Sequence, residues 1–471
     1  MKKLMIFVFV LTALSSFAQK GYDIQINIKN YDNDTLLLAY FYGEQQLIKD
    51  TVFAKEPGVF EYKGDTLLEP GVYIALVYPS KEYFQFMVNS EDQKFKIYTD
   101  YKDLQNIKIK GSKDNKLFFE YLAYIKEQNN LAQKLLKEKS KLDSLKQDTK
   151  AIDDKLQNLD EEVGEYQQKI IKKHPDLLTS LLIKSNIDID IPDFEGSEKE
   201  VNEKRYRYYY KHYFDNLDLK HPAVLRTPYI HRKIEDFIDK MTVPVADSIS
   251  KSIDLILSKM PPQSDIWKYY VSYFLNKYAK SNIIGMDAVF VHMAQNYYGK
   301  GLTPWVEEKQ LIRILDSAIR MEGVLIGKTA PELTLNKEDH SPVRLKDIKS
   351  DYTVLFFWKP DCGHCRHSMP DLIKFSDEYK DKGVTVMTIC TKLGKKSKKC
   401  WEGVKELKMQ GIPYNLADEK NQSGFHANYN IRATPTVFIL DKDKKILIKQ
   451  IPTDKLGEVM DSIMKENSEK Q

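Results

Sequence analysis

The chain has 471 residues, with 72 Lys or Arg against 68 Asp or Glu, so its net charge at pH 7 is only +4. This near balance argues against nucleic-acid binding and against a membrane-surface role, since both concentrate one sign of charge. A chain of this length is too long for one hydrophobic core, and we expect about two to four domains.

The first 18 residues predict a cleaved secretory signal peptide. Two lysines precede an apolar stretch from Leu4 to Leu14, and small residues follow it. The apolar stretch is too short to span a bilayer of about 30 Å, and no other segment approaches about 20 apolar residues. We therefore expect a secreted mature protein that begins near Gln19 and is not embedded in a membrane. No cysteine follows the cleavage position, so a lipid anchor has no attachment residue there.

Residues 19–111 alternate apolar and polar positions over short stretches. The alternation is clearest at 24–28, 36–42, 72–78 and 84–88. Such a period of two is typical of strands with one buried face, so we predict an antiparallel β-sandwich domain. The segment holds no cluster of catalytic residue types, which favours an interaction or spacer role.

Residues 112–325 carry a helical pattern and predict an all-α domain. Apolar residues recur in sevens in two interleaved series: Leu135, Leu142, Leu156, Val163 and Ile170, then Leu145, Ile152, Leu159 and Tyr166. The repeat predicts one long helix or a helical hairpin. A coiled-coil dimer stays open, but the breaks at Glu138 and Thr149 make packing inside the helical domain at least as good an interpretation.

The sequence KRYRYYYKHYF at 204–214 mixes basic and aromatic residues, as a surface that stacks single-stranded nucleic acid would. Its tyrosines fall at helical spacing, so one face can pack while Arg and Lys stems cover the edge. Because secretion also argues against a nucleic-acid partner, we expect a structural role.

Residues 326–471 alternate strand and helix patterns and predict an α/β domain. Continuous apolar runs at 352–358 and 384–390 predict central strands buried on both faces. Helices are expected at 368–383 and 400–411, and a hairpin at 434–451, with a last helix after it.

All four cysteines lie in this domain, and Cys362 and Cys365 stand between a predicted strand and a predicted helix. Zinc needs two further ligands, and Cys390 and Cys400 are poorly spaced to supply them. A structural disulfide across two residues would remove little chain entropy. The pattern therefore favours a redox-active disulfide between Cys362 and Cys365, which needs no other cofactor.

The helix N-terminus favours a thiolate at Cys362, and a protonated His364 would add positive charge beside it. Cys362 is thus the expected nucleophile, and Cys365 resolves the mixed disulfide. Pro370 falls inside the helix, where it should produce a kink.

Cys390 and Cys400 flank the flexible basic loop TKLGKKSKK and can close into a second disulfide. Because Cys390 ends a predicted central strand, a second redox pair or relay is the sharper hypothesis. Structural or unpaired thiols remain the preferred alternative.

The sequences APELTL, FWKPDCGHC and ATPTVFILD, together with Pro370, resemble the thioredoxin-like thiol-disulfide oxidoreductases over residues 326–466. The resemblance is closest to their secreted TlpA/ResA-like branch. It implies a thioredoxin fold, with a cis bond before Pro435 and the backbone of Thr434 facing the substrate chain. The residues expected to support the active site are Gly363, His364, Trp358, Pro360, Thr434 and Pro435.

Two positions depart from that family. Phe356 stands where thioredoxin has a buried aspartate, and Ser368 stands where ResA-like proteins have a glutamate. Both carboxylates that usually assist proton transfer at the resolving cysteine are therefore missing. Asp361, His367 or water could replace them, although Asp361 is equally suited to a solvated turn.

The resemblance implies exchange of disulfides in protein substrates. The Gly-His pair between the cysteines is that of protein disulfide isomerases. Their reduction potentials lie near −180 mV, against roughly −270 mV for thioredoxin, and this difference is worth about 4 kcal/mol for a two-electron exchange. The branch itself has reducing roles in the envelope and receives electrons from membrane donors of the DsbD/CcdA kind, so reductase and isomerase both stay open.

The whole arrangement resembles multidomain thioredoxin-like proteins of Gram-negative anaerobes, which implies a periplasmic location. A binding protein that uses the thioredoxin fold as a scaffold is the alternative function. A peroxidase is third, because such enzymes usually carry a lone reactive cysteine.

Overall fold

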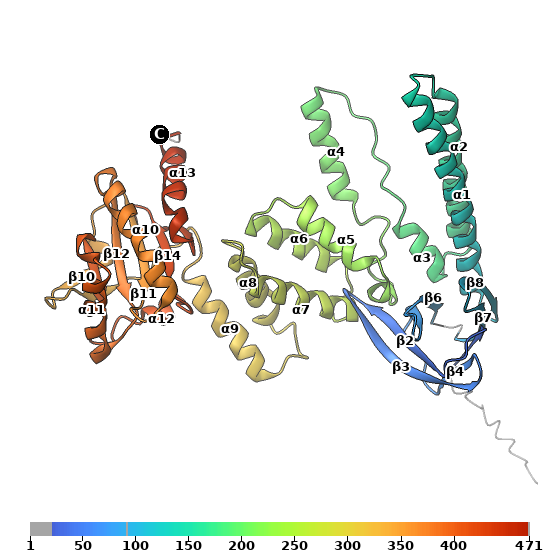
Figure 1. Ribbon diagram of the computed structural model, residues 1–471, viewed down its shortest axis with the longest axis horizontal. Coiled ribbons are helices and arrows are strands. Elements are labelled where there is room, and N and C mark those ends of the chain that lie inside the picture. The colour runs from blue at the N-terminus through green and yellow to red at the C-terminus, as the bar shows by residue number, and fades with distance from the viewer. Residues whose placement is uncertain (1–20, 91–92, 470–471) are drawn as a thin grey trace, which may run out of the picture. The chain divides into compact units, whose positions relative to one another are not determined.

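The computed structural model describes residues 21–90 and 93–469 (Figure 1). The predicted signal peptide lies outside the described residues. The chain forms two compact units, one reaching Phe237 and including Lys259–Pro261, the other made of Ile238–Ser258 and the chain from Pro262 onward. A β-rich N-terminal part, a helical middle and a C-terminal α/β part confirm the predicted fold class, while the predicted domain boundaries stay predictions.

The first unit begins with eight strands that form one sheet in the order β6-β5-β2-β3-β4-β1-β7-β8. Their bounds are β1 Tyr22–Lys29, β2 Thr35–Tyr42, β3 Gln45–Glu56, β4 Val59–Gly64, β5 Gly71–Val77, β6 Tyr83–Val88, β7 Lys94–Asp100 and β8 Asp103–Lys110. Phe86 of β6 contacts Phe95 of β7, although these strands are far apart in the sheet order. The two halves of the sheet therefore close over one apolar core, as expected for a sandwich.

One strand pair departs from the expected antiparallel arrangement. β1 and β7 pair in parallel, with Ile24 opposite Phe95 and Ile26 opposite Ile97. The reason is topological. Five strands lie between β1 and β7 along the chain, so no hairpin turn forces β7 to run antiparallel to β1.

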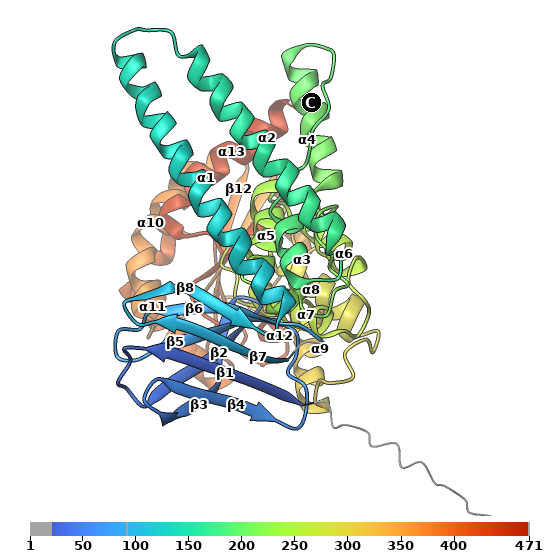
Figure 2. The ribbon, with the colours of Figure 1, turned by 90° about the vertical axis from the view of Figure 1, so that its right-hand side faces the viewer.

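The heptad region forms a helical hairpin, which confirms one of the two predicted arrangements. α1 (Lys113–Ser144) and α2 (Lys150–Lys173) lie side by side and antiparallel (Figure 2). The predicted break at Thr149 falls immediately before α2. The shorter helices that follow in this unit are α3 Leu178–Ser185, α4 Glu198–His212 and α5 Ile230–Asp236.

The tyrosine-rich stretch belongs to α4 and the residues after it. Tyr210 and Tyr213 both contact Phe237, and Phe214 is buried beside them. The packed aromatic face is the structural role expected from the spacing.

The helical part of the second unit contains α6 Ala246–Ser258, α7 Asp265–Ala279, α8 Asp287–Met293 and α9 Glu308–Glu322. A buried lysine ties this helical part to the C-terminal sheet. Lys449 is 3% exposed, and its ammonium pairs with Asp287 of α8 and donates to the carbonyl of Val324 at 2.6 Å. Because a buried ammonium needs partners of this kind, the contact joins the two parts of this unit.

The C-terminal sheet has the order β10-β9-β13-β12-β11-β14-β15. Its strands are β9 Thr334–Asn336, β10 Pro342–Arg344, β11 Tyr352–Trp358, β12 Val384–Cys390, β13 Tyr414–Ala417, β14 Thr436–Leu440 and β15 Ile446–Lys449. β11, β12 and β13 run parallel, and β14 and β15 form the predicted hairpin. The two predicted central strands are confirmed residue for residue.

Helices cover both faces of this sheet. Val354, Phe356 and Trp358 pack with apolar residues of α10 (Gly363–Tyr379), α11 (Lys398–Glu406) and α13 (Leu456–Glu469). The alternate side chains Leu355 and Phe357 pack with α12 (Phe425–Asn428). Burial on both faces explains why β11 is apolar throughout.

None of the described helices is both long enough and apolar enough to cross a membrane.

Candidate active site

The reactive pair lies at the carboxyl end of a central strand. β11 ends at Trp358, and after a three-residue turn Cys362 occupies the N-cap of α10. Cys365 is one turn inside that helix. Both thiols are free, with Cys362 8% exposed and Cys365 fully buried. The strand, turn and helix thus present the first sulfur toward solvent and keep the second behind it.

Cys362 has hydrogen-bond partners on two sides. Its Sγ accepts a hydrogen bond from the backbone N–H of Cys365 at 3.4 Å. The same thiol contacts the carbonyl oxygen of Thr434 at 3.2 Å, as a donor. The Thr434–Pro435 bond is cis, and both residues are partly exposed. The loop and the sulfur therefore lie together at one surface.

The surroundings of Cys362 lower the pKa of its thiol. Burial acts to raise this pKa, but hydrogen bonds from the side chain and backbone of Cys365, from Thr434 and from the backbone of His364 together outweigh it. Backbone N–H groups at a helix N-terminus stabilise the thiolate in this way. Cys362 is thus the better nucleophile of the pair.

The pKa of Cys365 moves in the opposite direction, to about 11. Burial is the main cause, and the hydrogen bond with Cys362 adds to it. The groups that lower this pKa are the backbone of Lys359 and the side chain of Thr434, and neither is a carboxylate. The Cys365 thiol is therefore protonated at neutral pH.

Two positions lack the usual carboxylates. Phe356 lies in the sheet core, and Ser368 lies on α10. The carboxylate of Asp361 pairs instead with Lys392 at 2.6 Å, and this hydrogen bond lowers the pKa of Asp361. The side chains of His364 and His367 are exposed. The backbone N–H of His364 is the part of that residue that acts on Cys362, and a role for its imidazole stays a prediction.

Two ion pairs brace the active-site turn, and our sequence reasoning missed both. Lys392 holds Asp361, the residue before the nucleophile. Arg366 pairs with Glu406 of α11 and also donates to the carbonyl of Pro360 at 3.3 Å. The partners are 31 and 40 residues apart in the chain, so no local pattern could have indicated them.

The other predicted support residues lie around the same turn. Trp358 is fully buried, and α11 approaches it so closely at Gly403 that an added Cβ would lie 3.0 Å from its ring and 2.9 Å from Cβ of Pro360. Gly363 opens α10, and Pro370 lies inside that helix as predicted. The kink expected at Pro370 stays a prediction.

Cys390 and Cys400 form a disulfide in the structure, with their Cα atoms 6.0 Å apart. Cys390 ends β12 directly opposite Trp358 of β11, and Cys400 lies in α11. Their exposed fractions are 1% and 0%. The bond therefore closes the basic loop beside the active site, with its sulfur atoms inside the core.

Within residues 21–90 and 93–469, no group of three or more His, Cys, Asp or Glu side chains is arranged to hold a metal ion.

Family models match three segments of the chain. The model described as the AhpC/TSA family matches residues 326–448. Two models described only as domains of unknown function match residues 22–118 and 144–321.

Curated relatives match the C-terminal part. A thioredoxin-like protein, YneN of Bacillus subtilis, is 32% identical over 120 residues, which are 26% of this chain and 68% of YneN. The thiol-disulfide oxidoreductase ResA of Bacillus thuringiensis is 28% identical over 145 residues, which are 31% of this chain and 79% of ResA.

A solved structure, a domain of a possible thiol-disulfide isomerase from Cytophaga hutchinsonii, is 31% identical. The match covers 31% of this chain and 96% of that domain, with a TM-score of 0.29. The AhpC/TSA match includes the cysteine pair at the start of α10, and the YneN match is 32% identical over 68% of that relative. This chain belongs to the thioredoxin-like family of thiol-disulfide oxidoreductases.

Proposed function

We propose that the chain exchanges disulfides with protein substrates through its CGHC site. The observation that carries the proposal is the position of Cys362, whose sulfur caps α10 and contacts the carbonyl of Thr434 beside the cis bond. A substrate chain that lies along this loop brings its disulfide to the sulfur with the lowered pKa.

The proposed reaction has two exchange steps. The Cys362 thiolate attacks one sulfur of the substrate disulfide, and the other substrate sulfur leaves as a thiolate that takes up a proton. Cys365 then loses its proton to solvent and attacks Cys362, which releases the second substrate thiol. The substrate gains two electrons, and the Cys362–Cys365 disulfide forms without any further cofactor.

The pKa of Cys365, about 11, bears on the second step. Once Cys362 is bonded to the substrate, its charge no longer opposes ionisation of Cys365. With Phe356 and Ser368 in place of carboxylates, we propose that water accepts this proton. When Cys365 is replaced, no thiol remains to resolve the mixed disulfide, so mixed disulfides should accumulate.

A periplasmic location and a membrane electron donor of the DsbD/CcdA kind belong to the same proposal. They are supported by the signal-like N-terminal sequence and by the resemblance to the secreted branch. Whether the chain acts as a reductase or an isomerase is tested by comparing insulin reduction with refolding of a substrate that carries scrambled disulfides.

Insulin reduction with dithiothreitol as electron source tests the proposal. The wild-type chain should turn over insulin, and Cys362→Ala should lose at least about 1,000-fold in rate, because no other thiol of the described site has a lowered pKa. A matched Lys374→Ala variant changes an exposed residue of the same helix and should leave the rate unchanged. Equal rates for wild type and Cys362→Ala would instead favour the binding or scaffold alternative.

A further inference from the structure

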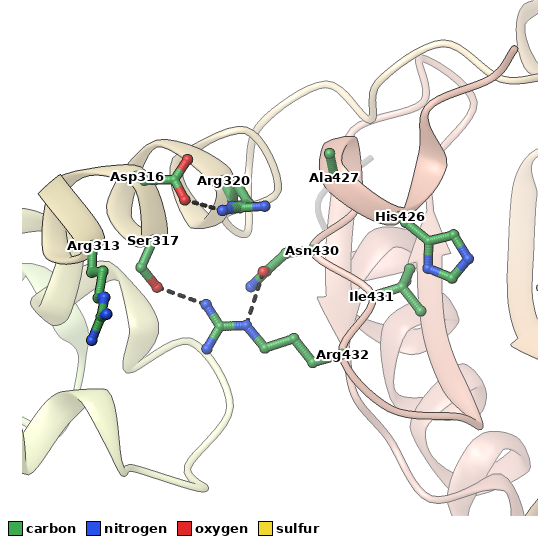
Figure 3. A pocket seen from close by; sticks show the side chains of 9 residues that line it. All are labelled: Arg313, Asp316, Ser317, Arg320, His426, Ala427, Asn430, Ile431 and Arg432. Carbon is green, nitrogen blue, oxygen red and sulfur yellow. Dashed lines mark hydrogen bonds and ion pairs between the residues drawn. The ribbon is translucent and has the colours of Figure 1, made fainter.

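A cationic pocket lies within the second unit, between α9 and the segment 426–432 (Figure 3). Its volume is about 560 Å³. α9 contributes Arg313, Asp316, Ser317 and Arg320, and the facing segment contributes Arg432 among others. Three guanidinium groups therefore meet one carboxylate.

The single carboxylate is already neutralised. Asp316 pairs with Arg320 one turn along α9. Arg432 is held in place by neutral partners, since it donates to Oγ of Ser317 at 2.6 Å and to Oδ1 of Asn430 at 3.1 Å. Arg313 has no hydrogen-bond or ion-pair partner among the residues that the structure describes. The pocket thus presents an oriented guanidinium and an unpaired one to the same space.

The pocket adjoins the reactive sulfur through the chain itself. Arg432 stands two residues before Thr434, whose carbonyl contacts Cys362. Two residues span at most about 7 Å, so an extended substrate chain on Thr434 reaches the pocket within about two or three residues of its own cysteine.

The lysine-rich loop beside the pocket is also basic. His426 of the pocket contacts the carbonyl of Thr391 at 3.4 Å, where the lysine-rich loop begins. In that loop Lys395, Lys396, Lys398 and Lys399 are exposed. Positive charge therefore continues beside the pocket, and it favours acidic chains over basic ones.

We propose that this pocket, defined by Arg313, Arg320 and Arg432, binds an aspartate or glutamate side chain of the client protein, two or three residues from the cysteine that Cys362 attacks. Guanidinium groups suit this ligand because they donate two parallel hydrogen bonds to a carboxylate. The inference rests on the proposed disulfide exchange and adds a substrate class to it. Clients with an acidic residue near their disulfide are reduced faster than neutral ones.

Two disulfide-linked peptides test the proposal, identical except for Glu or Gln three residues after the attacked cysteine. The full mature chain reduces them with dithiothreitol as electron source, and kcat/KM is compared. We expect the Glu peptide to be favoured about three- to tenfold, which is typical of partly exposed charge pairs. The preference should shrink at about 1 M salt, where the Debye length is only about 3 Å.

Charge reversal in the pocket sharpens the test. Arg313→Glu should remove or invert the preference for the Glu peptide. Arg344→Gln is the matched control, because Arg344 lies in β10 and pairs with Asp347 outside the pocket, and this variant should keep the wild-type ratio.

The outcomes separate this inference from the proposed function. If both peptides are reduced equally, and Cys362→Ala abolishes both reactions, the acidic-client assignment is overturned while disulfide exchange stands. If neither peptide nor insulin is reduced, the proposed function fails and the inference fails with it.

Discussion

Two cysteine pairs lie at the ends of neighbouring strands in one sheet, and the fold uses them differently. Cys362 follows β11 and caps a helix, and it is 8% exposed with a free thiol. Cys390 ends the adjacent strand β12, is 1% exposed, and is bonded to Cys400. Nearly the same place in the sheet therefore holds one pair with free thiols and one closed disulfide.

The comparison shows that position at a sheet edge does not make a cysteine reactive. Cys362 gains hydrogen bonds from the N-terminus of α10, which stabilise its thiolate. Cys390 and Cys400 have sulfur atoms in the core, where a substrate disulfide cannot reach them. This burial argues against the relay hypothesis and favours a structural role.

The largest expected difference is in alkylation rate, between the two cysteines of the pair with free thiols. The thiolate fraction of Cys362 at pH 7 should exceed that of Cys365 by about 100-fold, because their pKa values differ by at least about two units in the direction that favours Cys362. Iodoacetamide labelling followed by mass spectrometry of each cysteine measures this. As pH rises, labelling of Cys362 should reach its plateau first, and that of Cys365 should have its midpoint near 11. Equal rates at both cysteines would contradict the assignment of nucleophile and resolver.

Removal of the second disulfide should change stability more than activity. The double variant Cys390→Ser, Cys400→Ser opens a loop of sequence separation 10, which should cost about 2–3 kcal/mol of unfolding free energy. Urea unfolding measures this, and insulin reduction should stay within about threefold of wild type. Cys362→Ala is the contrasting variant, with lost activity and little change in stability. Loss of turnover in a folded double variant would revive the relay hypothesis.

Gly403 tests how closely α11 packs on the active-site turn. Gly403→Ala places a Cβ 2.9 Å from Cβ of Pro360, so overpacking should cost about 1–3 kcal/mol, partly offset by about 1 kcal/mol of helix propensity. Gly457→Ala is the matched control in α13, where the nearest contact would be an ordinary 3.5 Å. Thermal unfolding should show a lower midpoint for the first variant and an equal or higher one for the second. Matching midpoints would mean that α11 is not so tightly packed.

The smallest effect is expected at the Asp361–Lys392 pair. The hydrogen bond from Lys392 lowers the pKa of Asp361, so the pair stabilises the fold above the unfolded pKa of about 3.9 and loses this contribution as pH falls through the folded value. Because Asp361 is exposed, the effect should be under about 1 kcal/mol. Lys392→Met should therefore flatten the acid limb of a stability-against-pH curve slightly. An unchanged acid limb would show that the pair contributes nothing measurable.

Much of the C-terminal domain was predictable from local pattern. The apolar runs at 352–358 and 384–390 coincide with β11 and β12, because strands buried on both faces must be apolar throughout. The last helix also begins where its apolar spacing starts, at Leu456. Cys362 and Cys365 were predictable because a CxxC pair between a strand and a helix is specific.

What escaped prediction depends on residues far apart in the chain. β3 carries exposed Ile48 and Phe53, so its pattern does not alternate and it gave no strand signal. The pairing of Lys392 with Asp361 and the pocket around Arg432 each join segments that only the fold brings together. Charged residues at the surface have no periodic signature, which is why these contacts were missed.

Mixed-disulfide trapping tests the roles of the two active-site cysteines most directly. The Cys365→Ala chain, incubated with oxidised insulin, should accumulate an adduct in which an insulin chain is bonded to Cys362, because no resolving thiol remains. Digestion and mass spectrometry identify the linked cysteine, and Cys362→Ala should give no adduct. An adduct at Cys390 or Cys400, or equal adduct yields in the two variants, would contradict the assignment of Cys362 as nucleophile.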